Sequence, residues 1–260
     1  SCLVGSEMCI RDRRRAKNDI AVTDADFPIS RSYIAMLSET GATPVVQSKW
    51  FATVVVESPD STVAEQLQQL AIVDSVKWIW KGNLRVPAEE KREDRFVSED
   101  EPLHNEYGYS YKQIKMLNGT KLHEAGFRGE GMRVAVIDAG FMNADRVSAF
   151  DSLRLLGTHN VVFPGKSVFV GDDHGTKVLS CLAADIPGVM VGTAPKASYL
   201  LLKSEDSDSE YPVEEDYWTA AVEYADSAGV DVISSSLGYF AFDTDELSYD
   251  QDALDGRTAM

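Results

Sequence analysis

The sequence predicts an α/β fold, in which helices cover both faces of a parallel sheet, preceded by a small α+β unit. From about residue 107 onward, continuous apolar strands alternate with helical segments, which is typical of strands buried on both faces of a parallel sheet. Residues 28–83 hold shorter helices and β-branched strands in a different order, which indicates a separate unit.

The composition of the chain excludes some classes of protein and some kinds of partner. At 260 residues the chain can hold one large domain or two small ones, and its 44% hydrophobic content is ordinary for a globular protein. The formal net charge of −17 argues against nucleic-acid partners, because phosphate contacts need Lys and Arg. The sequence has no apolar run long enough to predict a membrane span. Its three cysteines form no disulfide framework, and Cys181, inside an apolar segment, is expected to be a small buried hydrophobe.

Two segments are expected to lie outside the folded domains. Residues 1–13 have no apolar core for a signal peptide and resemble a translated adapter scar, so we expect a non-native leader. The basic run at 11–17 is expected to be a solvated tail or an exposed helix end, with a localisation or nucleic-acid patch as the alternative. Residues 87–106 are dominated by charge and predict a linker. The domains would then occupy 14–86 and 107–260.

The first domain is predicted to follow the order helix, strand, strand, helix, strand. Thr62 and Glu65 have the spacing of a capping box at the start of the second helix. The order is close to a ferredoxin-like βαββαβ unit. The expected elements are helices over 30–37 and 62–71 and strands over 43–47, 51–57 and 73–80.

The second domain is predicted to alternate strands and helices. Ligands of open α/β sheets bind beyond the carboxyl ends of the strands, so residues that end strands are the candidates for a functional site. The expected helices cover 113–117, 119–126, 174–185 and 214–226, and the expected strands cover 131–138, 161–163, 197–203 and 230–238.

Asp138 and His174 are the strongest candidates for catalysis. Asp138 ends an apolar strand and is followed by Ala139 and Gly140, which let the backbone turn away at once. His174 begins an apolar helix, where it can face a cleft. Each alone has a structural interpretation, as a turn Asp or a core His. Together they are two thirds of a Ser-His-Asp triad in the chain order Asp, His, Ser.

Four motifs give the chain a specific resemblance. Over about residues 107–242 it is similar to the subtilisin-like serine proteases, which implies that Asp138 stabilises the imidazolium and that His174 is the general base. The resemblance also implies that Ser236, Leu237 and Gly238 pair with the substrate backbone and line its primary specificity pocket. It rests on the sequence motifs at 134–140, 174–176, 192–195 and 235–238.

The resemblance extends more loosely to residues 14–86, which are similar to the inhibitory propeptide of the same family. It implies a serine endopeptidase precursor with a polypeptide substrate, its own propeptide as partner, and a secreted or cell-envelope location. The family's Gly-Thr-Ser nucleophile motif and oxyanion Asn do not occur before Met260, so we expect a truncated chain, nearly inert by itself. Ala139 stands where the family commonly has Ser or Thr, which removes a hydroxyl. The alternative is a non-catalytic pseudoprotease that binds peptides.

Other sites are disfavoured by missing motifs. No glycine-rich phosphate loop follows the strand at 134–138, and no Gly-x-Ser-x-Gly elbow is present, which disfavours nucleotide-binding enzymes and esterases. The acidic stretch 204–210 lacks EF-hand spacing, so we expect a solvated loop that would favour basic peptide side chains if it lies near a cleft. His104, His123 and His159 lack metal-ligand spacing, and no metal site or cofactor is expected.

Overall fold

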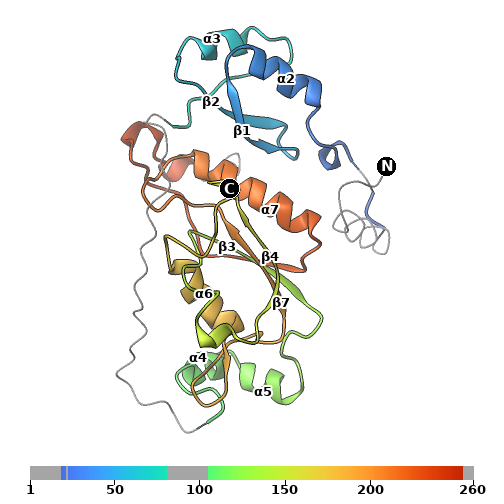
Figure 1. The fold of residues 1–260 in the computed structure, drawn as a ribbon, viewed down its shortest axis with the longest axis vertical. Coiled ribbons are helices and arrows are strands. Elements are labelled where there is room, and N and C mark those ends of the chain that lie inside the picture. Colours follow the sequence, from blue (N-terminus) through green and yellow to red (C-terminus); the bar gives the residue numbers. More distant parts are fainter. Residues whose placement is uncertain (1–18, 22, 81–104, 254–260) are drawn as a thin grey trace. The chain divides into compact units, whose positions relative to one another are not determined.

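The computed structural model describes residues 19–21, 23–80 and 105–253 (Figure 1). These residues divide into two compact units. The first contains described residues of Ser1–Val86, Ser209–Ser227 and Gly238–Met260, and the second those of Pro87–Asp208 and Ala228–Leu237. Several segments discussed above lie outside the described residues: the expected leader 1–13, the basic run 11–17, His104 and all but the last two residues of the expected linker 87–106.

A four-stranded sheet forms the centre of the second unit. Its order within the described residues is β4-β7-β3-β8, and all three pairs of neighbouring strands are parallel. The predicted α/β class with a parallel sheet is therefore confirmed. The two central strands are buried almost throughout, because their side chains are apolar on both faces. The strands are β3 (Arg133–Asp138), β4 (Arg154–Asn160), β7 (Ser198–Lys203) and β8 (Val232–Ser235).

Helix α6 (His174–Ala183) packs against β3 and shares its hydrophobic core (Figure 1). Leu179 of the helix and Val136 and Leu201 of the sheet are all 0% exposed. The short 3-10 helix η2 (Ser148–Phe150) contributes Phe150 to the same core. This packing fixes the first turn of α6 close to the carboxyl end of β3, where Asp138 lies.

Helices α4 (Tyr111–Met116) and α5 (Gly119–Glu124) follow each other in the second unit. A buried histidine of α5, His123, hydrogen-bonds to residues outside these helices. His123 Nε2 lies 2.9 Å from the carbonyl oxygen of Thr193, and His123 Nδ1 lies 3.2 Å from the Tyr107 hydroxyl. A carbonyl oxygen can only accept, so Nε2 carries the hydrogen and Nδ1 accepts from Tyr107. His123 is thus a satisfied structural residue.

The first unit is built on an antiparallel hairpin of β1 (Thr43–Ser48) and β2 (Thr53–Glu57). Helices α2 (Arg31–Glu39) and α3 (Val63–Gln68) contribute Leu37, Val63 and Leu67 to its small core. Helix α7 (Val213–Ser227) belongs to the same unit and packs against β1 (Figure 1). The 3-10 helices η1 (Asp24–Asp26), η3 (Asp245–Leu247) and η4 (Gln251–Ala253) complete it.

The order helix, strand, strand, helix is confirmed in this unit, but two local predictions are wrong. Residues 73–80 form no strand, and the Val76 N–H donates to the side chain of Gln68 at 3.1 Å rather than to a neighbouring strand. The capping box is also absent. Thr62 already has helical φ and ψ of −68° and −20°, and its N–H donates to Asp60 Oδ1 at 2.9 Å.

Three predictions for the second unit need correction. The strand expected at 161–163 lies earlier, as β4, because the Asn160 side chain accepts the Phe163 N–H at 2.8 Å and turns the chain. Cys181 is exposed instead of buried. The end of the expected helix 174–185 instead enters a two-stranded hairpin of β5 (Asp185–Ile186) and β6 (Met190–Val191).

Candidate active site

The structure brings Asp138 and His174 into direct contact. Asp138 Oδ1 accepts hydrogen bonds from His174 Nδ1 at 2.7 Å and from the Ala139 N–H at 2.8 Å. The Asp138 side chain is 0% exposed, whereas the His174 side chain is 51% exposed. Because Asp138 holds the hydrogen on Nδ1, the second ring nitrogen, Nε2, is the one available to act as a base.

Close backbone packing makes this contact possible. A Cβ atom on Gly175 would lie 2.9 Å from Asp138 Cβ and would also clash with the Gly140 carbonyl oxygen. Glycine at 175 therefore lets the first turn of α6 approach the end of β3. Asp172 Oδ1 accepts the backbone N–H of His174 at 2.7 Å, which holds the start of the helix.

The second carboxylate oxygen of Asp138 has an unusual environment. Oδ2 is buried and has no hydrogen-bond partner among the described residues. Burial raises the pKa of Asp138 above its ordinary value, although the hydrogen bonds from His174 and from the Ala139 N–H act in the opposite direction. Nearby, the Lys203 ammonium donates to the carbonyl oxygen of Ala139. Residue 139, an alanine, brings no hydroxyl donor to this carboxylate.

Ser236 and Leu237 directly follow β8, at the carboxyl edge of the same sheet. Ser235 pairs with Ile137, the residue before Asp138, so β8 and β3 end side by side. Ser236 is exposed and Leu237 half-buried. Gly238, the third residue of the predicted substrate-binding set, is exposed and is grouped with the other compact unit.

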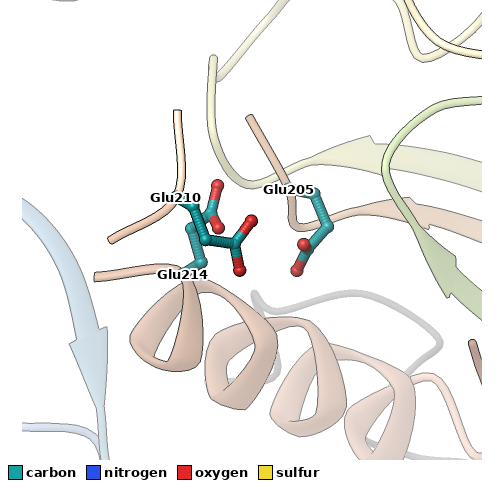
Figure 2. Close-up of side chains that lie close together, drawn as sticks. All are labelled: Glu205, Glu210 and Glu214. Carbon is teal, nitrogen blue, oxygen red and sulfur yellow. The ribbon is translucent and has the colours of Figure 1, made fainter. Parts of the chain in front are cut away.

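Acidic side chains gather around the start of α7, where the sequence analysis expected only a solvated loop over 204–210. Glu210 precedes the helix and Glu214 lies in its first turn, and their carboxylate oxygens lie within 4.8 Å of each other (Figure 2). Burial and the charge of Asp243 raise the pKa of Glu210 above its ordinary value. The loop expected to be solvated is partly buried, since Ser204 is 0% and Glu205 9% exposed. The alternation of apolar strands and helices in the sequence does not predict that these acidic residues are buried.

The described residues also bear on metal binding and on membrane insertion. Among the described residues, no cluster of possible metal ligands includes a histidine. None of the helices in the described part of the chain is long and apolar enough to cross a membrane.

Comparison with known proteins finds one family model and several curated relatives that are similar to this chain. Residues 9–98 match the family model "Peptidase S8 propeptide domain, Bacteroidota". The chain is 32% identical over 147 residues to subtilisin E of Bacillus subtilis, covering 55% of this chain and 36% of that relative. It is 31% identical over 133 residues to the major intracellular serine protease of the same organism, covering 48% of this chain and 40% of that relative. The chain thus spans well under half the length of these relatives.

The fold agrees with these matches. Fervidolysin from Fervidobacterium pennivorans, a keratinolytic enzyme related to subtilisin, superposes with a TM-score of 0.53 at 15% identity, over 86% of this chain and 36% of that chain. At this identity the likeness concerns the fold alone. Taken together, the propeptide match, the subtilisin relatives and the shared fold show that the chain is similar to the subtilisin-like serine proteases.

Proposed function

We propose that the chain is part of a serine endopeptidase precursor that hydrolyses peptide bonds through a Ser-His-Asp triad. The observation that carries this proposal is the 2.7 Å contact between Asp138 Oδ1 and His174 Nδ1. It pairs a fully buried carboxylate with a half-exposed imidazole, as general-base catalysis requires. The nucleophilic serine would come from a segment outside this sequence.

The proposed reaction uses the imidazole twice. His174 Nε2 takes the proton of the serine hydroxyl while the serine oxygen attacks the substrate carbonyl. The resulting imidazolium then donates that proton to the leaving amine, which leaves an acyl-enzyme. Water hydrolyses the acyl-enzyme by the same route. The ionised form of Asp138 stabilises the imidazolium throughout and keeps the ring in one orientation.

The proposed substrate-binding residues are Ser236, Leu237 and Gly238. They follow β8, which is an edge strand of the described sheet. An extended peptide can add to such an edge through backbone hydrogen bonds, with its side chains entering pockets. The position of Ser236 beside the end of β3 supports this role, because it lies at the edge of the sheet that also carries Asp138.

Residues 14–86 are proposed to be the propeptide and 107–260 the start of the peptidase domain. The family match over residues 9–98 supports the first assignment. The contact between β1 and α7 supports an intramolecular partnership of the propeptide with the peptidase sequence. The secreted or cell-envelope location stays a prediction, since one relative is named an intracellular protease.

The test is to join the chain to its following coding segment and measure hydrolysis of a fluorogenic peptide. His174→Ala should lower kcat by about 10⁴-fold or more, because a triad without its base retains only residual catalysis. His159→Gln, on another strand of the same sheet, is the matched control and should retain activity. A completed protein that binds peptides without cleaving them would replace this proposal with the pseudoprotease.

A further inference from the structure

A buried lysine ends the central strand β7. Lys203 is the last residue of this strand and only 7% exposed, although the residues before it are largely apolar. Lysine is almost never buried to this degree unless its ammonium group is paired or hydrogen-bonded. In the parallel register of β3 and β7, Lys203 stands opposite Asp138. A buried cation therefore ends one central strand where the candidate catalytic carboxylate ends the other.

The Lys203 ammonium reaches the turn that follows Asp138, where it donates a hydrogen bond to the carbonyl oxygen of Ala139. The N–H group of Ala139 in turn donates to Asp138 Oδ1 at 2.8 Å. The same carboxylate oxygen accepts from His174 Nδ1 at 2.7 Å. Residue 139 is thus held at its carbonyl by the lysine and at its N–H by the carboxylate. Hydrogen bonds that run through this residue connect Lys203 to His174.

The backbone at Lys203 is fixed on both sides. Its carbonyl oxygen accepts the Val161 N–H at 2.9 Å, and the N–H of the next residue, Ser204, donates to the Asp138 carbonyl oxygen at 3.1 Å. The first bond ties the end of β7 to the chain after β4, and the second ties it to β3. Side chains that begin on strands are placed more precisely than those on loops. The ammonium therefore starts from a fixed point beside the turn after Asp138.

We propose that Lys203 is a positioning residue for the pair of Asp138 and His174. By holding the carbonyl of Ala139, the ammonium restricts the backbone torsions of that residue, and with them the direction of its N–H toward Asp138 Oδ1. A carboxylate oxygen held in this way presents a second acceptor position to His174 Nδ1. Lys203 acts through residue 139 and transfers no proton itself. The catalytic meaning of this inference rests on the proposed function, whereas the effect on the contact does not.

A lysine that only contributes to the packing of the sheet would behave differently. Its replacement would lower the stability of the second unit and leave the contact between Asp138 and His174 unchanged. A positioning lysine affects that contact beyond any loss of stability, because catalytic groups must be held within about 0.5 Å of their productive geometry. The contact itself is therefore the quantity to measure.

The first experiment uses this chain and needs no hydrolysis. Lys203→Met removes the ammonium and keeps a side chain of similar length. In NMR of the ¹⁵N-labelled protein, this variant should lose the downfield Nδ1 proton signal of His174. The matched control is Lys196→Met, which removes a lysine that lies just before the same strand and pairs with Asp185 at 2.5 Å. The control should keep the signal, even if both substitutions lower the Tm.

Two results of this experiment would overturn the proposal: a signal that persists in Lys203→Met, or a signal that is lost in both variants. If Lys203→Met does not unfold cooperatively, another pair of variants decides the question. Lys203→Arg keeps a charged donor at this position and should retain the signal. Lys203→Gln has a shorter, uncharged side chain and should lose it. Equal signals from the arginine and glutamine variants would contradict the positioning role.

The second experiment uses the protein joined to its following coding segment. There Lys203→Met should lower kcat for a fluorogenic peptide by about 10- to 100-fold and leave KM unchanged, because a misplaced base slows the chemical step without altering substrate binding. An unchanged kcat, or an equal loss in Lys196→Met, would refute a catalytic effect of this lysine. If the unsubstituted protein hydrolyses no peptide, the proposed function is lost, and the NMR result on Asp138 and His174 still stands.

Discussion

Glu223 of α7 accepts a hydrogen bond from the Ser48 hydroxyl at 2.6 Å, although the two residues are 175 positions apart in the sequence. The same carboxylate receives the N–H groups of Lys49 and Trp50 at 3.2 and 3.1 Å. Both partners are buried, with Ser48 3% and Glu223 9% exposed. One carboxylate thus satisfies the donors of the turn that joins β1 to β2.

Glu223→Ala should weaken the first unit. The substitution leaves one buried hydroxyl and two N–H groups of the turn without their acceptor, at a cost of about 2 kcal/mol in the free energy of unfolding. Urea denaturation followed by tryptophan fluorescence measures this loss. Glu65→Gln, on the exposed side of α3, is the control and should change stability little. Equal stability of the two variants would show that the three hydrogen bonds contribute nothing.

Ala139→Thr should supply the donor that Asp138 Oδ2 lacks. A hydroxyl that donates to Oδ2 favours the ionised carboxylate and lowers the pKa of Asp138. The expected gain is about 1 kcal/mol at neutral pH. It should disappear at acidic pH, where Asp138 is protonated in both the folded and unfolded states. Denaturation at the two pH values measures it.

The control for that experiment is Ala139→Val, which has the shape of threonine without the hydroxyl. The valine variant should show no pH-dependent gain. If valine and threonine stabilise equally at neutral pH, packing rather than hydrogen bonding explains the effect.

Gly175→Ala should separate His174 from Asp138. The added Cβ would meet Asp138 Cβ at 2.9 Å and Phe141 Cε1 at 2.9 Å, so the start of α6 has to move. Overpacking of this kind costs about 1–3 kcal/mol. Loss of the downfield Nδ1 proton signal of His174 in NMR would report the broken contact. Gly157→Ala, whose Cβ would lie an ordinary 3.8 Å from Leu200, should keep both signal and stability.

Tyr107→Phe should leave His123 Nδ1 buried without its donor. A buried acceptor without a partner costs about 1–3 kcal/mol, which differential scanning calorimetry would detect as a lower Tm. Tyr109→Phe, two residues along, is the matched control. A drop of equal size in both variants would mean that the loss of any tyrosine hydroxyl in this segment is destabilising.

The pairing of Asp138 with His174 could be predicted from the sequence because it depends on local rules. A parallel strand ends at Asp138, and a helix that packs on that strand begins at His174, so both fall at one edge of the sheet. The parallel sheet could be predicted for the same reason, because the alternation of apolar strands and helices is also a local pattern of the sequence.

The sequence could not predict features that depend on distant partners. Residues 73–80 have strand-like composition, but β-propensity is realised only where a neighbouring strand is available, and none pairs with them in the described chain. The grouping of α7 with the hairpin of the first unit depends on Glu223 meeting Ser48, and no periodicity encodes such a long-range contact. Glu215 of α7 is only 5% exposed, and this burial likewise depends on tertiary packing.

The contact between Glu223 and Ser48 also means that the first unit cannot complete its fold until late in synthesis on the ribosome. The hairpin of β1 and β2 emerges early, but the carboxylate that completes its turn emerges 175 residues later. Until then the N–H groups of Lys49 and Trp50 have only water as partner. Contacts of such high sequence separation slow folding, so residues 19–80 should stay open to proteases and chaperones until the ribosome has translated α7.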